Sequence, residues 1–260
     1  MYEFVCGFIY GLYCKLWFLL FSRDNLYVSL NTYKTNSLRI MSYNVKAMFA
    51  YYYSQRIDQL VAFISCQFEN DLVDVVCVQE AFEDDFVMRL SAVAKRKDLH
   101  IVCPPINNKY YVGENSGLVT ISRVPIVGHS SLVYPMSTGM CGLANKGAHI
   151  IRLSANCAIV NTHLQSDNCP IAVKQLDYLL DRMPEETVLL CGDFNMNRRQ
   201  MYKDRFTFCG PERVTVPEMG EQLDHFVILD KTIEYSNFRV LVDALCSDHY
   251  PICVEIKVSI

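Results

Sequence analysis

The sequence predicts one α/β domain, a two-layer β-sandwich of mixed, mostly antiparallel sheets flanked by helices. Three observations support this. The 260 residues are 51% hydrophobic and 20% charged, which suits a single packed domain. Strand-like and helix-like apolar patterns alternate along the chain. Short turns separate most strand-like runs of the second half, which indicates antiparallel pairing and not a doubly wound parallel sheet.

The elements follow from these apolar patterns in chain order. We expect a strand at 38–43, a helix at 57–68, a strand at 73–78 and a helix at 82–93. A later helix fits 170–182, with Pro170 in its first turn. Further strands are expected at 99–103, 117–122, 148–153, 157–162, 187–191, 224–229 and 251–258.

The N-terminal segment differs from the rest of the chain. Residues 4–21 are almost wholly apolar and are interrupted only by Lys15, which predicts an apolar helix with the length of a marginal membrane span. We therefore expect a membrane anchor at 1–24, a linker at 25–37 and the folded domain at 38–260. The alternative is a helix that packs on the domain.

The location of the protein follows from that segment. Lys15, Arg23 and Lys34 favour a domain that faces the cytoplasm if the segment spans the membrane. We expect a cytoplasmic or membrane-associated protein, with secretion left open.

Charge and cysteine usage narrow the class further. The net charge of −4 and the pI of about 5.9 argue against a strongly basic face that grips long nucleic acid. Of twelve cysteines, Cys77, Cys157, Cys191 and Cys253 lie in apolar strand-like runs, where they are expected to be small buried hydrophobes. No C-x-x-C pair predicts a zinc site, and we favour a reducing compartment.

Polar side chains recur where the strand-like runs end. Carboxylate and amide oxygens together with histidines suit a divalent cation such as Mg²⁺ and a phosphate. Each fragment alone is weak, since a lone histidine is more often structural and Asp-x-Asn is commonly a turn. Together they predict a metal-dependent hydrolase of a phosphate ester. The set comprises Asn44, Glu80, His163, Asp193, Asn195, Asp224, Asp248 and His249.

The order of these motifs is specific to one family. The chain carries Ser-Tyr-Asn44, Gln-Glu80, Ser116-Gly117, Ser122-Arg123, Asn-Thr-His163, Gly-Asp193-Phe-Asn195, Leu-Asp224 and Ser-Asp248-His249. In this it resembles the endonuclease/exonuclease/phosphatase superfamily over residues 38–258. That superfamily has the DNase I-like fold and includes nucleases, inositol phosphatases and sphingomyelinases.

The resemblance implies a role for each residue. Glu80 would be the main metal ligand, helped by Asn44 and Asp248, with Mg²⁺ as the cofactor and Mn²⁺ as an alternative. His249 would be the general base that activates water, and Asp224 would orient its ring. Asp193 would align the water, while Asn195 and His163 would hold the phosphate and stabilise the transition state. No covalent intermediate is needed.

Three segments are similar to the sphingomyelinase-like branch, which implies a phospholipid phosphodiesterase that favours lipid over nucleic acid. They are Thr162-His163-Leu164-Gln165, Asn145-Lys146-Gly147 and the run from Gly192 to Met196. Lys146 would pair with the phosphate or be an ordinary loop lysine, and both interpretations stay open.

Two alternatives come from the same residues. A nuclease or DNA-end-processing phosphodiesterase is favoured by Arg198, Arg199, Lys203 and Arg205, which interleave with Tyr202 and Phe206. A solvated loop is the competing interpretation of that cluster. A catalytically inactive binding module is disfavoured because every expected catalytic position is filled. Oligomeric state is not predicted, and Tyr51, Tyr52 and Tyr53 suit either stacking on a ligand or packing.

Overall fold

The computed structural model describes residues 35–48, 54–103, 116–201, 205–244, 246–258 and 260. Four segments discussed above lie outside the described residues: the apolar segment 4–21, most of the expected linker, the three tyrosines 51–53, and residues 202–203 of the basic cluster. No helix within the described ranges is long and apolar enough to cross a membrane.

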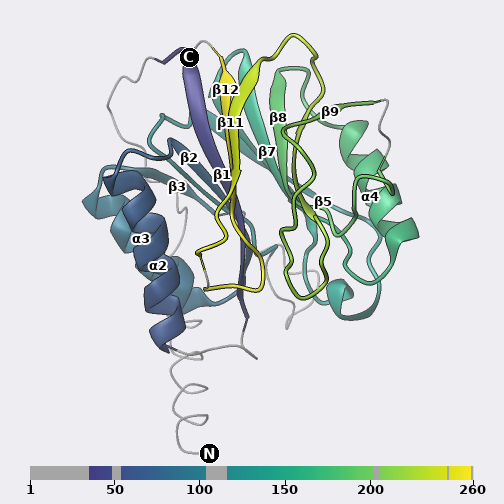
Figure 1. Ribbon diagram of the computed structural model, residues 1–260, viewed down its shortest axis with the longest axis horizontal. Helices are drawn as coiled ribbons and strands as arrows, with labels where there is room; N and C mark the ends of the chain where they lie inside the picture. The colour runs from purple at the N-terminus through teal and green to yellow at the C-terminus, as the bar shows by residue number, and fades with distance from the viewer. Residues whose placement is uncertain (1–34, 49–53, 104–115, 202–204, 245, 259) are drawn as a thin grey trace, which may run out of the picture.

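Two six-stranded sheets stack face to face (Figure 1). The first has the order β11-β12-β1-β2-β4-β3 and the second the order β5-β6-β7-β8-β10-β9. The first sheet comprises β1 (Ser37–Ala47), β2 (Val75–Ala81), β3 (His100–Val102), β4 (Val119–Ser122), β11 (Tyr235–Val240) and β12 (Ile252–Lys257). The second comprises β5 (Gly128–Val133), β6 (Gly147–Ser154), β7 (Cys157–His163), β8 (Thr187–Asp193), β9 (Thr207–Phe208) and β10 (Asp224–Ile228).

Helices cover the outer faces of both sheets (Figure 1). The helices α2 (Ser54–Glu69) and α3 (Asp84–Arg96) pack on the first sheet, and α4 (Cys169–Leu180) packs on the second. A short 3-10 helix, η2 (Gly139–Gly142), precedes β6. The predicted fold class is therefore confirmed. Only the pairs β1–β2 and β7–β8 are parallel, and the other strand pairs of the two sheets are antiparallel.

Successive side chains of a central strand pack alternately against the other sheet and against the helices. In β1, Leu38 and Ile40 face the second sheet, whereas Met41 and Tyr43 face the helices, because successive side chains point to opposite faces of a strand. Both faces are covered, so continuous apolar runs occur in β2 from Val75 to Val78 and in β8 from Val188 to Cys191. The four cysteines expected to be buried are buried free thiols.

Three strands were not predicted, namely β5, β9 and β11. Each of them lies at the edge of a sheet. No side chain of β5 or β11 is fully buried, so burial imposes only a weak apolar pattern on their sequences. Every strand and helix expected within the described residues is present, with ends that differ by a few residues.

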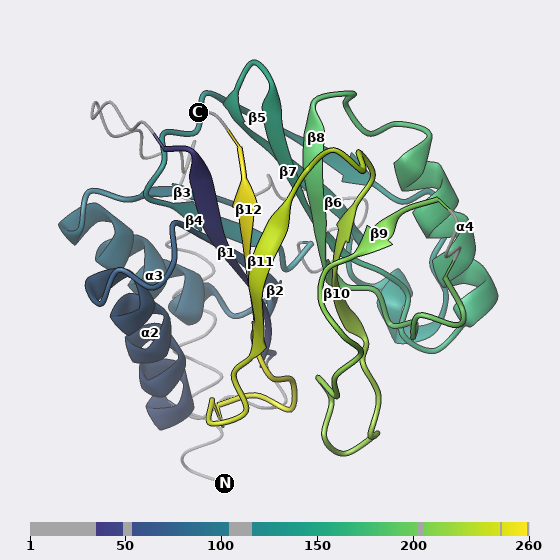
Figure 2. The same cartoon turned by 45° about the horizontal axis from the view of Figure 1, so that its top comes forward.

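Both parallel pairs end at the same end of the sandwich, and their registers align the polar residues. In the second sheet Asp193 is the partner of His163 on one side and of Asp224 on the other. Gly192 permits this close packing: its φ is 139°, and a Cβ there would lie 1.9 Å from the Thr162 carbonyl oxygen. The loop before β10 and the described parts of the loop before β12 project from this end (Figure 2).

Candidate active site

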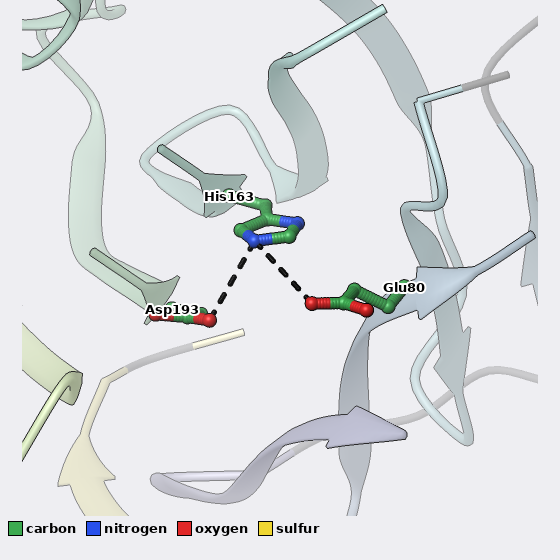
Figure 3. Close-up of side chains that lie close together, drawn as sticks. All are labelled: Glu80, His163 and Asp193. Carbon is green, nitrogen blue, oxygen red and sulfur yellow. Dashed lines mark ion pairs between the residues drawn. The ribbon is translucent and has the colours of Figure 1, made fainter. Parts of the chain in front are cut away.

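Three acidic and imidazole groups form a cluster where the two sheets meet. His163 ends β7 and Asp193 ends β8, and His163 Nε2 lies 3.5 Å from Asp193 Oδ2. Glu80, near the end of β2 in the other sheet, places Oε1 3.7 Å from the same nitrogen (Figure 3). Both sheets therefore contribute to one site.

Asn44 links the two carboxylates of this cluster. Its Nδ2 donates to Glu80 Oε1 and to Asp193 Oδ2, both at 2.9 Å. Its Oδ1 accepts from the Lys46 backbone N–H at 3.0 Å, which fixes the orientation of the amide. Glu80 has a φ of 55°, a left-handed conformation that non-glycine residues seldom adopt and that concentrates at functional sites.

A histidine–aspartate pair lies beside the cluster. His249 Nδ1 donates to Asp224 Oδ2 at 2.8 Å, and both side chains are buried. His249 Nε2, the other ring nitrogen, lies 3.8 Å from Asp193 Oδ2 and so faces the site. Burial alone would lower the pKa of His249, but the Asp224 and Asp193 carboxylates outweigh burial and raise the pKa to about 10.

Lys146 is a buried cation beside the site-facing nitrogen of His163. Its Nζ donates to His163 Nε2 at 2.6 Å and to the Leu164 carbonyl at 3.2 Å. Burial lowers the pKa of Lys146, and burial with the nearby Lys146 charge lowers that of His163 well below its ordinary value. His163 is therefore a neutral imidazole with its Nε2 as acceptor.

Asn195 closes the turn that follows β8. Its backbone N–H donates to Asp193 Oδ1 at 2.8 Å, and its Nδ2 donates to the Leu164 carbonyl at 3.0 Å. Its φ of 50° is left-handed. Asn195 therefore holds both Asp193 and the segment after His163 in place.

These side chains fit a divalent cation. Ligand atoms of Glu80, His163 and Asp193 lie within 4.8 Å of one another, as do those of Asp193, Asp224 and His249. Burial, together with the nearby Asp224 carboxylate, raises the pKa of Asp193 to about 6. Carboxylate oxygens with an imidazole are donors that Mg²⁺ and Mn²⁺ accept.

Eight of the nine site residues predicted from sequence lie in this hydrogen-bonded and ion-paired assembly. Asp248 is the ninth: it is adjacent to His249, but its Oδ2 accepts from Lys46 Nζ at 2.5 Å. Asp248 belongs to neither metal-competent group found among the described residues. Sequence reasoning did not single out Lys46. The chemical roles of all nine residues stay predictions.

The basic cluster after β8 is partly used within the fold. Arg198 donates to the carbonyls of Gly210 at 3.0 Å and Pro211 at 3.3 Å, and its guanidinium lies over the Phe208 ring. Arg205 pairs with Asp177 at 3.2 Å. The two arginines thus have structural contacts, which supports the solvated-loop interpretation over a nucleic-acid surface.

The fold and the site together define a two-sheet α/β protein with a candidate hydrolytic centre at its strand ends. The model of the Endonuclease/Exonuclease/phosphatase family matches residues 41–249, so the chain belongs to that family. No curated protein matches it in sequence.

Solved structures share the fold at low sequence identity. Sphingomyelinase C from Streptomyces griseocarneus superposes with a TM-score of 0.64 at 19% identity, over 85% of this chain and 99% of that one. A beta toxin mutant from Staphylococcus aureus with bound magnesium ions gives 0.62 at 18% identity, over 84% and 99%. Humanized D. rerio TDP2 gives 0.64 at 16% identity, over 86% and 100%.

Proposed function

We propose that the protein is a divalent-metal-dependent phosphodiesterase that hydrolyses a phospholipid by water attack, in the manner of a sphingomyelinase. The observation that carries this proposal is the buried His249–Asp224 pair, which faces the Glu80, His163 and Asp193 cluster. A base and its orienting carboxylate stand beside a set of metal donors, which is the arrangement that metal-assisted hydrolysis requires.

Each side chain has a task in this proposal. Glu80, with Asn44 beside it, would hold Mg²⁺ or Mn²⁺. Bound there, the ion would supply Lewis acidity toward a phosphoryl oxygen. Its positive charge would also counteract the carboxylates that raise the pKa of His249, and so would favour the unprotonated ring. His249 Nε2 takes the proton of the attacking water, while Asp224 keeps the ring oriented through Nδ1. Asp193 aligns that water.

The phosphate is held from the other side of the site. Asn195 and the Lys146 ammonium would contact the phosphoryl oxygens, and His163 would hold that ammonium in the site through Nε2. Because Lys146 is buried, the attraction of its ammonium for a phosphate is screened less than it would be in water. These groups therefore stabilise the negative charge that develops in the transition state.

Exposed apolar side chains support a lipid substrate. The segments that lead to Lys146, Asp224 and Asp248 carry an apolar rim, in which Met140 is 79% and Met219 is 63% exposed. The rim comprises Met140, Leu143, Val214, Met219 and Val242. Large apolar side chains that project around a polar site suit contact with the surface of a bilayer.

A groove lies beside part of this rim. The groove has a volume of about 730 Å³, and its lining includes Val214, Val242 and Tyr250 together with the charged Glu212, Arg213 and Arg239. Tyr250 directly follows His249, and its backbone N–H donates to the Thr215 carbonyl at 2.7 Å. The apolar part of a lipid would lie in this groove with its phosphate near His249.

The experiment compares substrates with the full chain. We expect Mg²⁺-dependent release of phosphorylcholine from sphingomyelin vesicles and its loss in EDTA. Phosphoinositide vesicles, single-stranded DNA and RNA serve as the other substrates. Cleavage of DNA without lipid turnover would favour the nuclease alternative. Full activity of Glu80→Gln and His249→Ala would refute the mechanism.

The role of the rim has its own test. Met219→Glu should lower turnover of vesicles but not of bis(p-nitrophenyl) phosphate, a soluble diester. Val127→Glu is the matched control, because Val127 is 66% exposed and precedes β5 at the opposite end of the sandwich. Equal effects of the two variants on vesicles would contradict the lipid surface.

Membrane association through residues 4–21 and a catalytic domain facing the cytoplasm belong to the same proposal. The Lys15, Arg23 and Lys34 charges support this orientation. Cell fractionation provides the test, since recovery of the full chain in the soluble fraction alone would refute the anchor.

A further inference from the structure

Lys46 is fixed at the edge of the site by contacts of its backbone. It lies two residues after Asn44, and its backbone N–H donates to Asn44 Oδ1. Arg56 of α2 donates to the Lys46 carbonyl at 3.1 Å and also to the Val45 carbonyl. The φ of Lys46 is 47°, at the irregularity in the β1–β2 register between Asn44 and Ala47. These contacts fix the backbone of Lys46, which limits the positions that its ammonium group can reach.

The side chain of Lys46 pairs with Asp248. Nζ lies 2.5 Å from Asp248 Oδ2, and both side chains are about three-quarters buried, with 26% and 22% exposed. The other oxygen, Oδ1, accepts from Ser247 Oγ at 3.3 Å. Each carboxylate oxygen of Asp248 thus has a donor from the protein.

This pair lies close to the carboxylates that surround His249. Three carboxylates, those of Asp224, Asp193 and Asp248, act on His249 and favour its charged form. Such a region attracts cations. Lys46 pairs directly with the Asp248 carboxylate there. The cation at the Glu80 cluster is Lys146, which donates to His163 Nε2 and to the Leu164 carbonyl. Among the described residues it makes no ion pair with the Glu80 or Asp193 carboxylate, so those oxygens stay available to a metal.

We propose that the Lys46 ammonium takes the place of a second divalent cation beside Asp248. The chain then binds one divalent cation, at the Glu80 cluster, and Asp248 is not one of its ligands. This inference rests on the proposed function, because it assumes that Glu80 holds a metal. A divalent cation on Asp248 would have to displace the Lys46 ammonium, which lies 2.5 Å from Asp248 Oδ2, or bind next to it. Two positive charges so close together repel each other.

The test counts Mn²⁺ ions bound to the full chain by electron paramagnetic resonance of the free ion. Wild type should bind one Mn²⁺ per chain. Asp248→Asn should also bind one, with its Kd changed by less than about tenfold, the smallest effect expected when a metal contact is lost. Lys46→Met should gain a second, weaker site. Lys46→Arg keeps the charge and should bind one, and it serves as the matched control.

The outcomes separate this inference from the proposed function. Two Mn²⁺ ions on wild type, or loss of the single site in Asp248→Asn, would overturn the inference and leave the proposed function intact. A Lys46→Met chain that folds and still binds one ion would also overturn it. Wild type that binds no Mn²⁺ would refute the proposed function and the inference with it.

Discussion

Asp224→Asn is the sharpest test of the catalytic pair. The substitution keeps the size of the side chain and removes its charge. Asp224 Oδ2 accepts from His249 Nδ1, whereas Oδ1 is buried without a partner among the described residues. An asparagine therefore places its NH₂ group either in the unsatisfied position or against Nδ1. The second arrangement forces the ring proton onto Nε2, the nitrogen that must accept the proton of water.

The structure sets the expected magnitude. A carboxylate and an imidazolium whose charge centres are about 4 Å apart attract by about 4 kcal/mol at an effective dielectric constant of about 20. The amide retains only a hydrogen bond, which contributes about 1 kcal/mol. The difference of about 3 kcal/mol corresponds to a loss of roughly 10²-fold in kcat, at the lower end of the range for general acid–base catalysis.

The assay follows steady-state cleavage of sphingomyelin vesicles and of bis(p-nitrophenyl) phosphate with Mg²⁺. We expect a large fall in kcat and little change in KM. The double variant with His249→Ala should be no slower than His249→Ala alone, because the two residues act as a unit. Asp230→Asn is the control, since Asp230 is exposed and bonds only within its own turn. Wild-type kcat in Asp224→Asn would refute the reasoning.

Three further predictions concern stability. Burial lowers the pKa of His149 to about 3 and of His225 to about 4, so the unfolded chain takes up protons below about pH 6.5 that the folded chain does not. Acidification from about pH 7 to about pH 5 should therefore lower the free energy of unfolding by about 2 kcal/mol per histidine. Urea unfolding at both pH values measures this, and a pH-independent midpoint would contradict it. Gly192→Ala should destabilise the fold by at least about 3 kcal/mol, because its Cβ would meet the Thr162 carbonyl, and a Tm near wild type would show that the strands can separate there. Arg198→Ala should lose about 1–2 kcal/mol of stability with unchanged binding of single-stranded DNA, whereas weaker DNA binding would support the nuclease alternative.

The sequence revealed the central strands because they are buried on both faces. Runs such as Val75 to Val78 are apolar at every position, and a short run of this kind is typical of a strand covered on both sides. The edge strands β5, β9 and β11 gave no such signal. In β11 the residues alternate in polarity and burial only from Asn237 to Val240, and this stretch is too short to mark a strand without its pairing to β12. Such pairing is a long-range property that no local window contains.

The site was predictable for a related reason. Polar residues at the ends of buried strands stand out against apolar runs, and the order of the motifs identified the family. Lys46 could not be found this way. It is an ordinary lysine in sequence, and its partner Asp248 lies 202 residues further along the chain. The hydrogen bonds from Arg198 to the Gly210 and Pro211 carbonyls were equally unpredictable from sequence, because only the fold brings these residues together.

The strands β7, β8 and β10 cannot accept inserted residues without loss of the site, whereas the loops between them can. His163, Asp193 and Asp224 are aligned only while these strands keep their pairing. One residue inserted within β8 would turn Asp193 to the opposite face, since side chains alternate along a strand. Residues added to the loop before β10 would leave the alignment unchanged. Insertions and deletions can therefore remodel the surroundings of the site over evolutionary time while its interior stays the same.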